Sequence, residues 1–274
     1  MKAKKPVFAS DRLVARDTGP WAQEKLARLE RYAEMMTTAM KGKNWTSLNF
    51  IDLMCGPGMC VDTKSSVRSE FTGSTLRAIE TRFPFSRVIS TDISAANIDA
   101  LRHRLSGHER AGRVEALHAD CNDTAVINHL RSRTDGGLTL VFVDLIGTEV
   151  TMETIARLTH NRAMDLVVTW PEMDVRRNNA MMIEQPERWT AFFGTEKWLS
   201  IAKASPLHRV RDYTALYIRQ LKAIGYDHHH IADSVKNMGK GRLYRPLFAA
   251  RDPLGLKFWK AAAPVVKQPR LDGF

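Results

Sequence analysis

The feature that most constrains the fold is a short apolar stretch that ends in a glycine turn, over residues 47–60. Its first part, residues 48–53, is rich in branched and aromatic side chains and predicts a buried β-strand. Its second part, Gly56-Pro57-Gly58, lacks Cβ atoms at two positions, so a ligand can approach the backbone while Pro57 stiffens the turn. A strand that ends near an acid, Asp52, and leads into a glycine turn is typical of a nucleotide-binding loop.

Two classes of cofactor compete for this loop. A dinucleotide fold requires a third glycine where this chain has Val61, and its acid comes only after the second strand. Here Asp52 lies before the first glycine, as it does in the S-adenosylmethionine sites of class I methyltransferases. The turn therefore favours S-adenosylmethionine over NAD.

Three further apolar segments end at an acid. They cover residues 87–91, 114–118 and 138–143, and they lead to Asp92, Asp120 and Asp144. A fifth segment, residues 166–170, stops at Pro171. Helical stretches separate the segments, which predicts a parallel sheet with helices on both faces and right-handed crossovers. The acids and the glycine turn then share the carboxyl edge of the sheet, where ligands of open α/β folds bind.

The end of the chain completes the predicted fold class. Residues 229–235 and 244–250 predict two strands that Gly239-Lys240-Gly241 joins as an antiparallel hairpin. An irregular, partly helical insertion at about 172–207 and a helix that stops at Gly225 precede them. We predict an α/β, Rossmann-like, seven-stranded class I methyltransferase sheet with an antiparallel last strand, helices on both faces and a helical insertion after strand 5.

The chain is long enough for one sizeable core. Its hydrophobic content of 44% predicts a single methyltransferase-like domain over residues 21–263, which a lead helix opens at Trp21. Residues 1–20 are polar and broken by Gly19-Pro20, which predicts a flexible N-terminal arm, and residues 264–274 predict a loose C-terminal tail. Residues 62–70 have no apolar period, which predicts a lid over the cofactor, with a disordered connection as the alternative.

The candidate cofactor-binding residues lie at the ends of the first three strands. Asp52 can meet the amino group of the methionine moiety, while the amides of the glycine turn receive its carboxylate. Asp92 can accept from both ribose hydroxyls, and Asp120 would face the adenine edge. The alternative for Asp92 and Asp120 is a loop acid that caps a helix. The full set is Asp52, Cys55, Gly56, Pro57, Gly58, Asp92, Ile93, Asp120 and Cys121.

Asp144 is the candidate catalytic residue, because the end of the fourth strand lies nearest the expected methyl group. Methyl transfer needs alignment of a nucleophile with the sulfonium carbon, and a base that takes a proton. Asp144 is suited to be that base or to orient an amine, and a structural role stays open. No metal site is expected. The spacing of the three cysteines matches no common zinc set, and neighbouring residues of His228-His229-His230 point to opposite faces of a strand.

The formal charge of +11 and the pI of about 9.8 suit an acidic partner, and a solvated basic surface is the alternative. The candidate substrate-binding residues are polar or cationic and lie in the insertion and the terminal hairpin: Arg176, Arg177, Asn178, Lys240 and Arg242. Aromatic residues interleaved with them suit base stacking, although burial is the commoner fate of tryptophan. The cysteine content suits a reducing cytoplasm, and no apolar run is long enough to span a membrane.

Motifs along most of the chain resemble the three-Cys-motif partner proteins, a class I methyltransferase-like family. In chain order they are Trp21 with Glu24-Lys25-Leu26, Phe50-Ile51-Asp52-Leu53 with Gly56-Pro57-Gly58, Gly73-Ser74, Phe142-Val143-Asp144 with Gly147, Arg177-Asn178, Phe193-Gly194, and residues 252–257. The resemblance implies the fold and an S-adenosylmethionine pocket, with a three-Cys-motif protein as a candidate partner. The chain departs from the family where Leu145-Ile146 replaces Pro-Phe after Asp144 and where Met54-Cys55 replaces Phe-Ala.

Two functions from different classes follow. The first is an S-adenosylmethionine-dependent methyltransferase that acts on nucleic acid, or on a nucleic-acid-associated macromolecule, by direct methyl transfer. The second is a non-catalytic protein of the same fold that binds another protein, with or without the cofactor. The acids at successive strand ends favour the first, and the altered residues after Asp144 favour the second.

Overall fold

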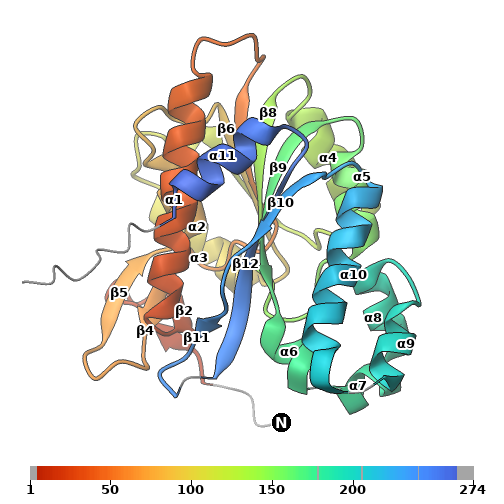
Figure 1. Cartoon of the computed structure of the whole chain (residues 1–274). Helices are drawn as coiled ribbons and strands as arrows, with labels where there is room; N and C mark the ends of the chain where they lie inside the picture. The colour runs from red at the N-terminus through yellow and green to blue at the C-terminus, as the bar shows by residue number, and fades with distance from the viewer. Residues whose placement is uncertain (1–4, 178, 205, 240, 264–274) are drawn as a thin grey trace, which may run out of the picture.

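The computed structural model describes residues 5–177, 179–204, 206–239 and 241–263, and a twisted sheet lies at its centre (Figure 1). From one edge to the other the strands are β10 (His228–Ile231), β12 (Arg242–Ala250), β9 (Ala163–Trp170), β8 (Leu138–Val143), β3 (Leu48–Asp52), β6 (Arg87–Asp92) and β7 (Val114–His118). Strands β9 to β7 are parallel, and β12 is antiparallel to both of its neighbours. The predicted sheet with an antiparallel last strand is confirmed.

Helices cover both faces of this sheet, as predicted. One face packs against α1 (Trp21–Met40), α2 (Ser74–Ile79), α3 (Ala95–Leu105) and α11 (Pro253–Ala261). The other packs against α4 (Thr124–Arg133), α5 (Met152–Thr159) and α10 (Arg209–Ala223). Neighbouring strand residues alternate between the two cores, so that Phe50 lies in the first and Ile51 in the second. This double covering explains why the strands are continuous apolar runs.

The helical insertion after β9 is also confirmed. It consists of α6 (Glu172–Arg177), α7 (Asn179–Glu184), α8 (Pro186–Phe193), α9 (Trp198–Lys203) and the 3-10 turn Pro206–His208. Trp189 and Trp198 are buried in the core that the insertion shares with α10, where Phe193 stacks on Tyr213. The insertion is therefore an extension of the core, and its two tryptophans are not free to stack on bases.

The predicted flexible arm is wrong for the described residues before Trp21. They form β1 (Val7–Phe8) and β2 (Val14–Thr18) of a second small sheet with β4 (Met59–Asp62) and β5 (Ser69–Thr72). Strand β2 pairs in parallel with β4, which places Arg16 opposite Cys60. The backbone pairing and a small cluster of Ala9, Ala15 and Val61 hold the segment down. Because β4, the partner of β2, lies far away in the sequence, the segment before Trp21 has no local apolar period from which its strands could be predicted.

The predicted unstructured lid over residues 62–70 is also wrong, because this segment is the turn of a β-hairpin. Strands β4 and β5 pair antiparallel, from Met59 opposite Thr72 to Asp62 opposite Ser69. The carboxylate of Asp62 accepts hydrogen bonds from the backbone nitrogens of Lys64 at 2.8 Å and Ser65 at 3.0 Å, which fixes the turn.

The predicted terminal hairpin is confirmed with one interruption. Strand β10 pairs with the second half of β12, and β11 (Val235–Lys236) pairs with its first half. Gly225 ends α10 with a positive φ of 93°. None of the helices in the described part of the chain is both long enough and apolar enough to cross a membrane.

Candidate functional site

The glycine turn lies at the carboxyl edge of the main sheet, where β2, β4, β11 and α6 gather at the lower end of Figure 1. Gly56 and Gly58 have φ values of 62° and 86°, which side chains rarely adopt. A Cβ on Gly58 would lie 2.9 Å from Leu101 Cδ1, and one on Gly73 would lie 3.0 Å from the carbonyl oxygen of Gly58. The Gly73 nitrogen donates to that oxygen at 2.7 Å, which joins the turn to the start of α2. The predicted turn therefore depends on glycine at these positions.

Asp52 lies behind the turn, fully buried under the first residues of α2. Its Oδ2 accepts hydrogen bonds from the hydroxyls of Ser74 at 2.5 Å and Thr75 at 3.2 Å. Burial raises the pKa of this carboxyl to about 7, although the hydrogen bond from Ser74 acts in the opposite direction. In this arrangement Asp52 anchors α2, and an amino group of a cofactor would have to compete with Ser74 for it.

The end of β6 brings Asp92 and Ile93 to the same edge. Asp92 Oδ2 accepts from the Gly56 nitrogen at 2.9 Å, and Oδ1 accepts from the Ser94 nitrogen at 2.8 Å and from Asn97 Nδ2 at 3.1 Å. Asp92 thus braces both the glycine turn and the start of α3, whose N-cap is Ser94. Beside it the Ile93 side chain is 72% exposed, which leaves an apolar surface next to a carboxylate.

The end of β7 lies beside that of β6, since the Ala119 nitrogen donates to the Asp92 carbonyl at 3.1 Å. Asp120 is exposed and its Oδ1 accepts from the Asn122 nitrogen at 2.8 Å. Cys121 is buried, and burial raises the pKa of its thiol to about 12. The structure thus places the candidates Asp92, Ile93 and Asp120 next to one another at the ends of β6 and β7, a surface that we call the shelf. Cys121 packs beneath it.

Asp144 lies at the other side of the turn in an ion-pair cluster. Its Oδ1 is 2.5 Å from Lys25 Nζ and accepts from Thr169 Oγ1 at 2.8 Å, and its Oδ2 is 3.6 Å from Arg16 Nη2. Burial by itself would raise the pKa of Asp144, but Lys25 and Arg16 outweigh it and hold the pKa below its ordinary value. Asp144 is therefore an ionised acceptor and a weak base.

The space around this cluster is small. A cavity of about 30 Å³ lies between Asp144, Lys25, Arg16, Cys60 and Ser74. A Cβ on Gly56 would lie 3.6 Å from Arg16 Nη1, so the guanidinium covers the glycine turn. Cys55 and Cys60 are buried there, and burial raises the pKa of both thiols. Within the described residues no three His, Cys, Asp or Glu side chains are grouped as a metal site would need.

Sequence reasoning missed Arg16, Lys25 and Ser74 as members of this site. Arg16 lies in the segment taken as an arm, and its position depends on the pairing of β2 with β4. Lys25 was part of the lead-helix motif, and its approach to Asp144 places that motif on the site. Ser74 is the first residue of α2, directly after the N-cap Gly73. Its hydroxyl donates to Asp52 and does not cap the helix.

The candidate substrate-binding residues divide into two groups. Arg176 and Arg177 are exposed on α6, at the carboxyl edge. Arg242 lies at the start of β12 and its Nη1 is 3.2 Å from Glu172 Oε1, a buried carboxylate of α6. Asn178 and Lys240 lie outside the described residues. Among the described members of the set, Arg176, Arg177 and Arg242 are all exposed, and Arg242 is the one paired with Glu172.

The fold is shared with solved structures. The chain is similar to protein LPL1258 from Legionella pneumophila, with 12% identity, a TM-score of 0.52, and coverage of 85% of this chain and 89% of that one. It also matches an O-methyltransferase from Bacillus cereus in complex with S-adenosylhomocysteine, with 12% identity, a TM-score of 0.48, and coverage of 88% and 86%. At these identities the first similarity shows the fold alone, and the second is too distant to carry an argument. Comparisons with protein-family models and with curated proteins find no match.

Proposed function

We propose that the chain is an S-adenosylmethionine-dependent methyltransferase that acts on nucleic acid or on a nucleic-acid-associated macromolecule. One observation carries the proposal. A turn with two positive-φ glycines at the end of β3 faces an acid and an exposed apolar residue, Asp92 and Ile93, at the end of β6. In an open α/β sheet this edge is where a nucleoside binds.

The adenosine half of the cofactor fits the described residues. A carboxylate has about four acceptor lone pairs, so after its three hydrogen bonds Asp92 has about one left, which suits one ribose hydroxyl as donor. The exposed side chain of Ile93 offers an apolar surface for the adenine ring, and Asp120, exposed on the neighbouring strand end, lies within the same shelf. From the sequence, Asp92 is predicted to meet the ribose and Asp120 the adenine edge, whereas Ile93 is predicted only as a cofactor-binding residue.

The methionine half fits only if Arg16 moves. A cavity of about 30 Å³ cannot hold this group, and the Arg16 guanidinium occupies the space above Gly56. Its contact with Asp144, at 3.6 Å, is the longer of the two ion pairs, and its side chain is 27% exposed. We therefore assign Arg16 as the partner of the cofactor carboxylate, which it would reach by turning away from Asp144.

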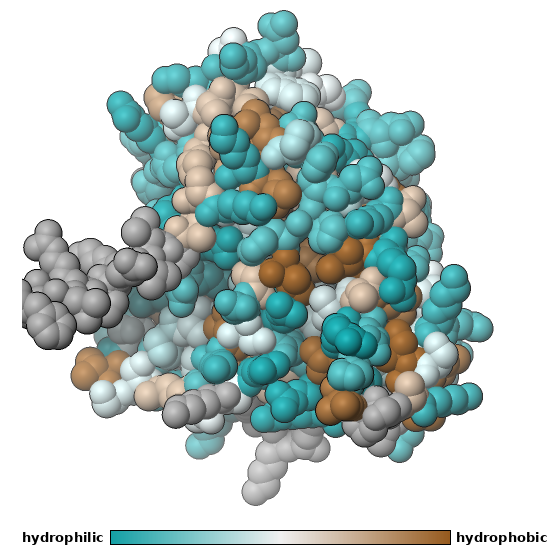
Figure 2. All heavy atoms as spheres, in the orientation of Figure 1, coloured by the Kyte–Doolittle hydropathy of each residue, from teal (hydrophilic) through white to brown (hydrophobic). Residues whose placement is uncertain are grey.

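The bound cofactor would supply a methyl group activated by a sulfonium. Asp144 stays ionised next to Lys25, so it is better suited to orient a donor group of the substrate than to remove a proton. Arg176 and Arg177, exposed at the same edge, would contact phosphates. The net charge of +11 and the largely hydrophilic face in Figure 2 are consistent with such a partner.

A second candidate function is a non-catalytic partner protein, and the small cavity favours it. If Arg16 and Lys25 permanently satisfy Asp144, the fold is kept while the methionine half of the pocket is filled by the chain's own cations. The protein partner would then be the principal ligand, with a three-Cys-motif protein as the candidate.

The two candidates make opposite predictions for Arg16→Ala. If Arg16 binds the cofactor carboxylate, the variant should bind S-adenosylmethionine at least about tenfold more weakly, the usual loss for a charge-assisted hydrogen bond. If Arg16 only fills the pocket, the variant should bind more tightly. Calorimetry on both proteins distinguishes them, with Arg12→Ala as the control, because Arg12 is an exposed arginine of the same segment.

Activity is measured as transfer of labelled methyl from S-adenosylmethionine to RNA, DNA or total protein. Transfer to nucleic acid is expected, and transfer only to protein would contradict that substrate. The Arg176→Ala, Arg177→Ala double variant should reduce the dependence of nucleic-acid affinity on salt by up to about two units of slope. Cofactor binding with no transfer to any of these would support the non-catalytic function.

A further inference from the structure

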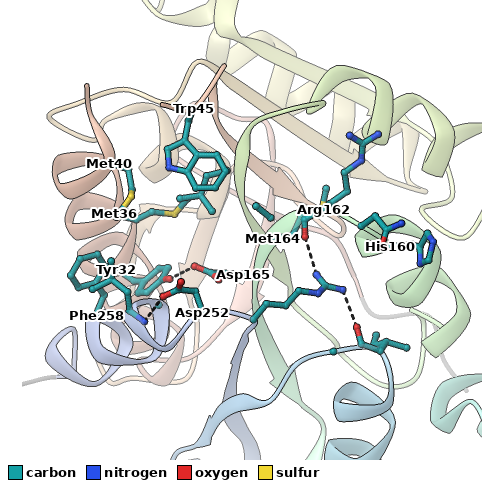
Figure 3. Close-up of a pocket in the computed structure, with 18 residues that line it drawn as sticks. Tyr32, Met36, Met40, Trp45, His160, Arg162, Met164, Asp165, Asp252 and Phe258 are labelled. Carbon is teal, nitrogen blue, oxygen red and sulfur yellow. Dashed lines mark hydrogen bonds between the residues drawn. The ribbon is translucent and has the colours of Figure 1, made fainter. Parts of the chain in front are cut away.

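A much larger cavity lies at the opposite end of the parallel strands, near the amino ends of β8 and β9. Its volume is about 730 Å³, within the range of small-molecule sites (Figure 3). Helices α1 and α11 form one side of it and the segment 160–162 forms the other. No step of the proposed methyl transfer involves this cavity, although three of its lining residues, Asp252, Leu254 and Gly255, belong to the motif at residues 252–257.

The walls on the helical side are apolar and partly aromatic. Figure 3 shows Met36, Met40, Trp45 and Phe258 on the same side of the cavity as Tyr32. Trp45 is 38% exposed although it is large and apolar, so one wall lacks a protein partner among the described residues. Methionine and aromatic side chains together form a surface that adapts to an apolar ligand and attracts a cation through the ring faces.

One carboxylate in this apolar setting has an unused acceptor. Asp165 is 8% exposed, and its Oδ2 accepts a hydrogen bond from the Tyr32 hydroxyl at 2.5 Å. Among the described residues Oδ1 accepts no hydrogen bond, and no cation lies within ion-pair distance of Asp165. Burial raises the pKa of Asp165 to about 6; the hydrogen bond from Tyr32 and the charge of Arg251 oppose this shift and Asp252 adds to it, so the group is mostly ionised at pH 7. A buried anion without a paired cation favours a cationic ligand.

The cations in the wall do not offer a comparable site for an anion. Arg251 donates to the carbonyl oxygens of Arg162 at 3.0 Å and Ile224 at 2.9 Å, and to the Tyr226 hydroxyl at 3.2 Å. Arg162 is paired with Asp135. Both guanidinium groups therefore have partners in the fold. Arg162 Nε has none among the described residues, but it is buried from solvent. Asp165 Oδ1 accepts no hydrogen bond from the described residues.

We propose that this cavity binds an organic cation with an apolar body, whose ammonium group pairs with Asp165 and whose body packs against Met36, Met40, Trp45 and Phe258. Asp252, the N-cap of α11, adds a second negative charge near the ammonium position. Gly255 admits this arrangement, because a Cβ there would lie 3.0 Å and 3.2 Å from the two oxygens of Asp165.

The test uses three probes that share one apolar chain and differ in charge: n-octylammonium, octan-1-ol and octanoate. Calorimetry on the full chain should show n-octylammonium binding at least about tenfold more tightly than octan-1-ol, with octanoate weakest. Equal affinities, or octanoate as the tightest probe, would overturn the proposal.

Asp165→Asn keeps the size of the side chain and an oxygen for the Tyr32 hydroxyl, and it should remove the preference for the ammonium probe. Asp99→Asn, at an exposed acid on α3 outside both sites, is the matched control and should leave all three affinities unchanged. An unchanged preference in Asp165→Asn would refute the pairing. The double variant Lys267→Ala with Arg270→Ala tests whether the chain's own C-terminal segment is the occupant of the cavity. If this variant binds n-octylammonium and the natural chain does not, the segment is the occupant and the proposal is wrong.

A pH titration of the natural protein tests the same pairing without a variant. The groups that face Asp165 are Tyr32 on α1, and Arg251 and Asp252 before α11. Between pH 7.5 and pH 5 Asp165 gains a proton, so affinity for n-octylammonium should fall about tenfold while affinity for octan-1-ol stays constant. His160→Gln is measured alongside as a control, because His160 also lines the cavity. An n-octylammonium affinity that does not depend on pH in either protein would contradict the proposal.

Discussion

The carboxyl and amino ends of the parallel strands, which we call the carboxyl edge and the amino edge, differ in their sequence motifs and in the size of the cavity beside them. The carboxyl edge carries the glycine turn and the strand-end acids, yet its ion-pair cluster leaves a cavity of about 30 Å³. At the amino ends of the strands the sequence offers only part of one motif, residues 252–257, yet there is a cavity of about 730 Å³. A motif reports the backbone geometry that a ligand requires, whereas a cavity depends on the side chains of helices that meet from distant parts of the chain.

The buried acids at the two edges, Asp144 and Asp165, also have different electrostatic environments. Asp144 is paired with Lys25 and Arg16, and its pKa is lowered. Asp165 has a hydroxyl donor and, among the residues that the structure describes, no paired cation, and its pKa is raised. The first carboxylate is stabilised in its charged form by the fold itself. The second has a charge that a ligand could neutralise, and this contrast can be tested by removing each charge in turn.

The largest expected effect is that of Asp144→Asn on stability. The change leaves Lys25 and Arg16 without their carboxylate, and breaking a buried pair typically costs about 3–5 kcal/mol. Asp165→Asn, the matched change at the amino edge, removes a carboxylate that has no paired cation and should be neutral or stabilising at pH 8. Urea denaturation of both variants measures the difference. Equal losses of unfolding free energy would show that the two acids have the same environment.

The dependence of stability on pH should be the next largest effect. The pKa values of Asp52 and Asp165 are about 7 and about 6 in the folded chain, above the ordinary value of about 3.9. Folding therefore binds protons, so their contribution is fully present below about pH 4 and is lost as pH rises through the folded values. Unfolding free energy should be higher at pH 5 than at pH 8 by on the order of 3 kcal/mol.

The Asp52→Asn and Asp165→Asn variants show how much of the pH dependence of stability comes from each carboxyl. Each should remove part of the difference between pH 5 and pH 8, and the larger part should belong to Asp52 because its pKa is higher. Asp120→Asn serves as the control. Stability that rises steadily from pH 5 to pH 8 in the natural protein would contradict the assignment of both raised pKa values.

A smaller effect is expected at the glycine turn. Gly58→Ala places a Cβ in a backbone with φ of 86° and at 2.9 Å from Leu101 Cδ1, so it should cost about 2 kcal/mol from strain and crowding. Gly107→Ala is the control, since nothing lies within 4 Å of a Cβ there. Thermal denaturation compares the two, and an equal change in Tm would mean that Gly58 is not required by the turn.

Most of the fold could be predicted from sequence, because apolar runs such as 138–143 are long and their separating helices have clear periods. The turn at Gly56 and Gly58 was predicted as well, since it depends on local backbone chemistry. The small sheet was missed because β2 finds its partner β4 only in the tertiary structure. For the same reason the sequence did not reveal Arg16 beside Asp144. The sequence left a base, an orienting group and a structural acid open for Asp144, and the ion pair with Arg16 makes the base the least favoured of the three.

The central claim is that the carboxyl edge binds S-adenosylmethionine through the glycine turn and the shelf of Asp92 and Ile93. Calorimetry with S-adenosylhomocysteine tests it most directly, because this ligand needs no methyl acceptor. The account predicts a Kd in the micromolar range or below, weakened at least about tenfold by Asp92→Ala. The absence of binding to the natural protein, or a preference for NAD over S-adenosylhomocysteine, would contradict it.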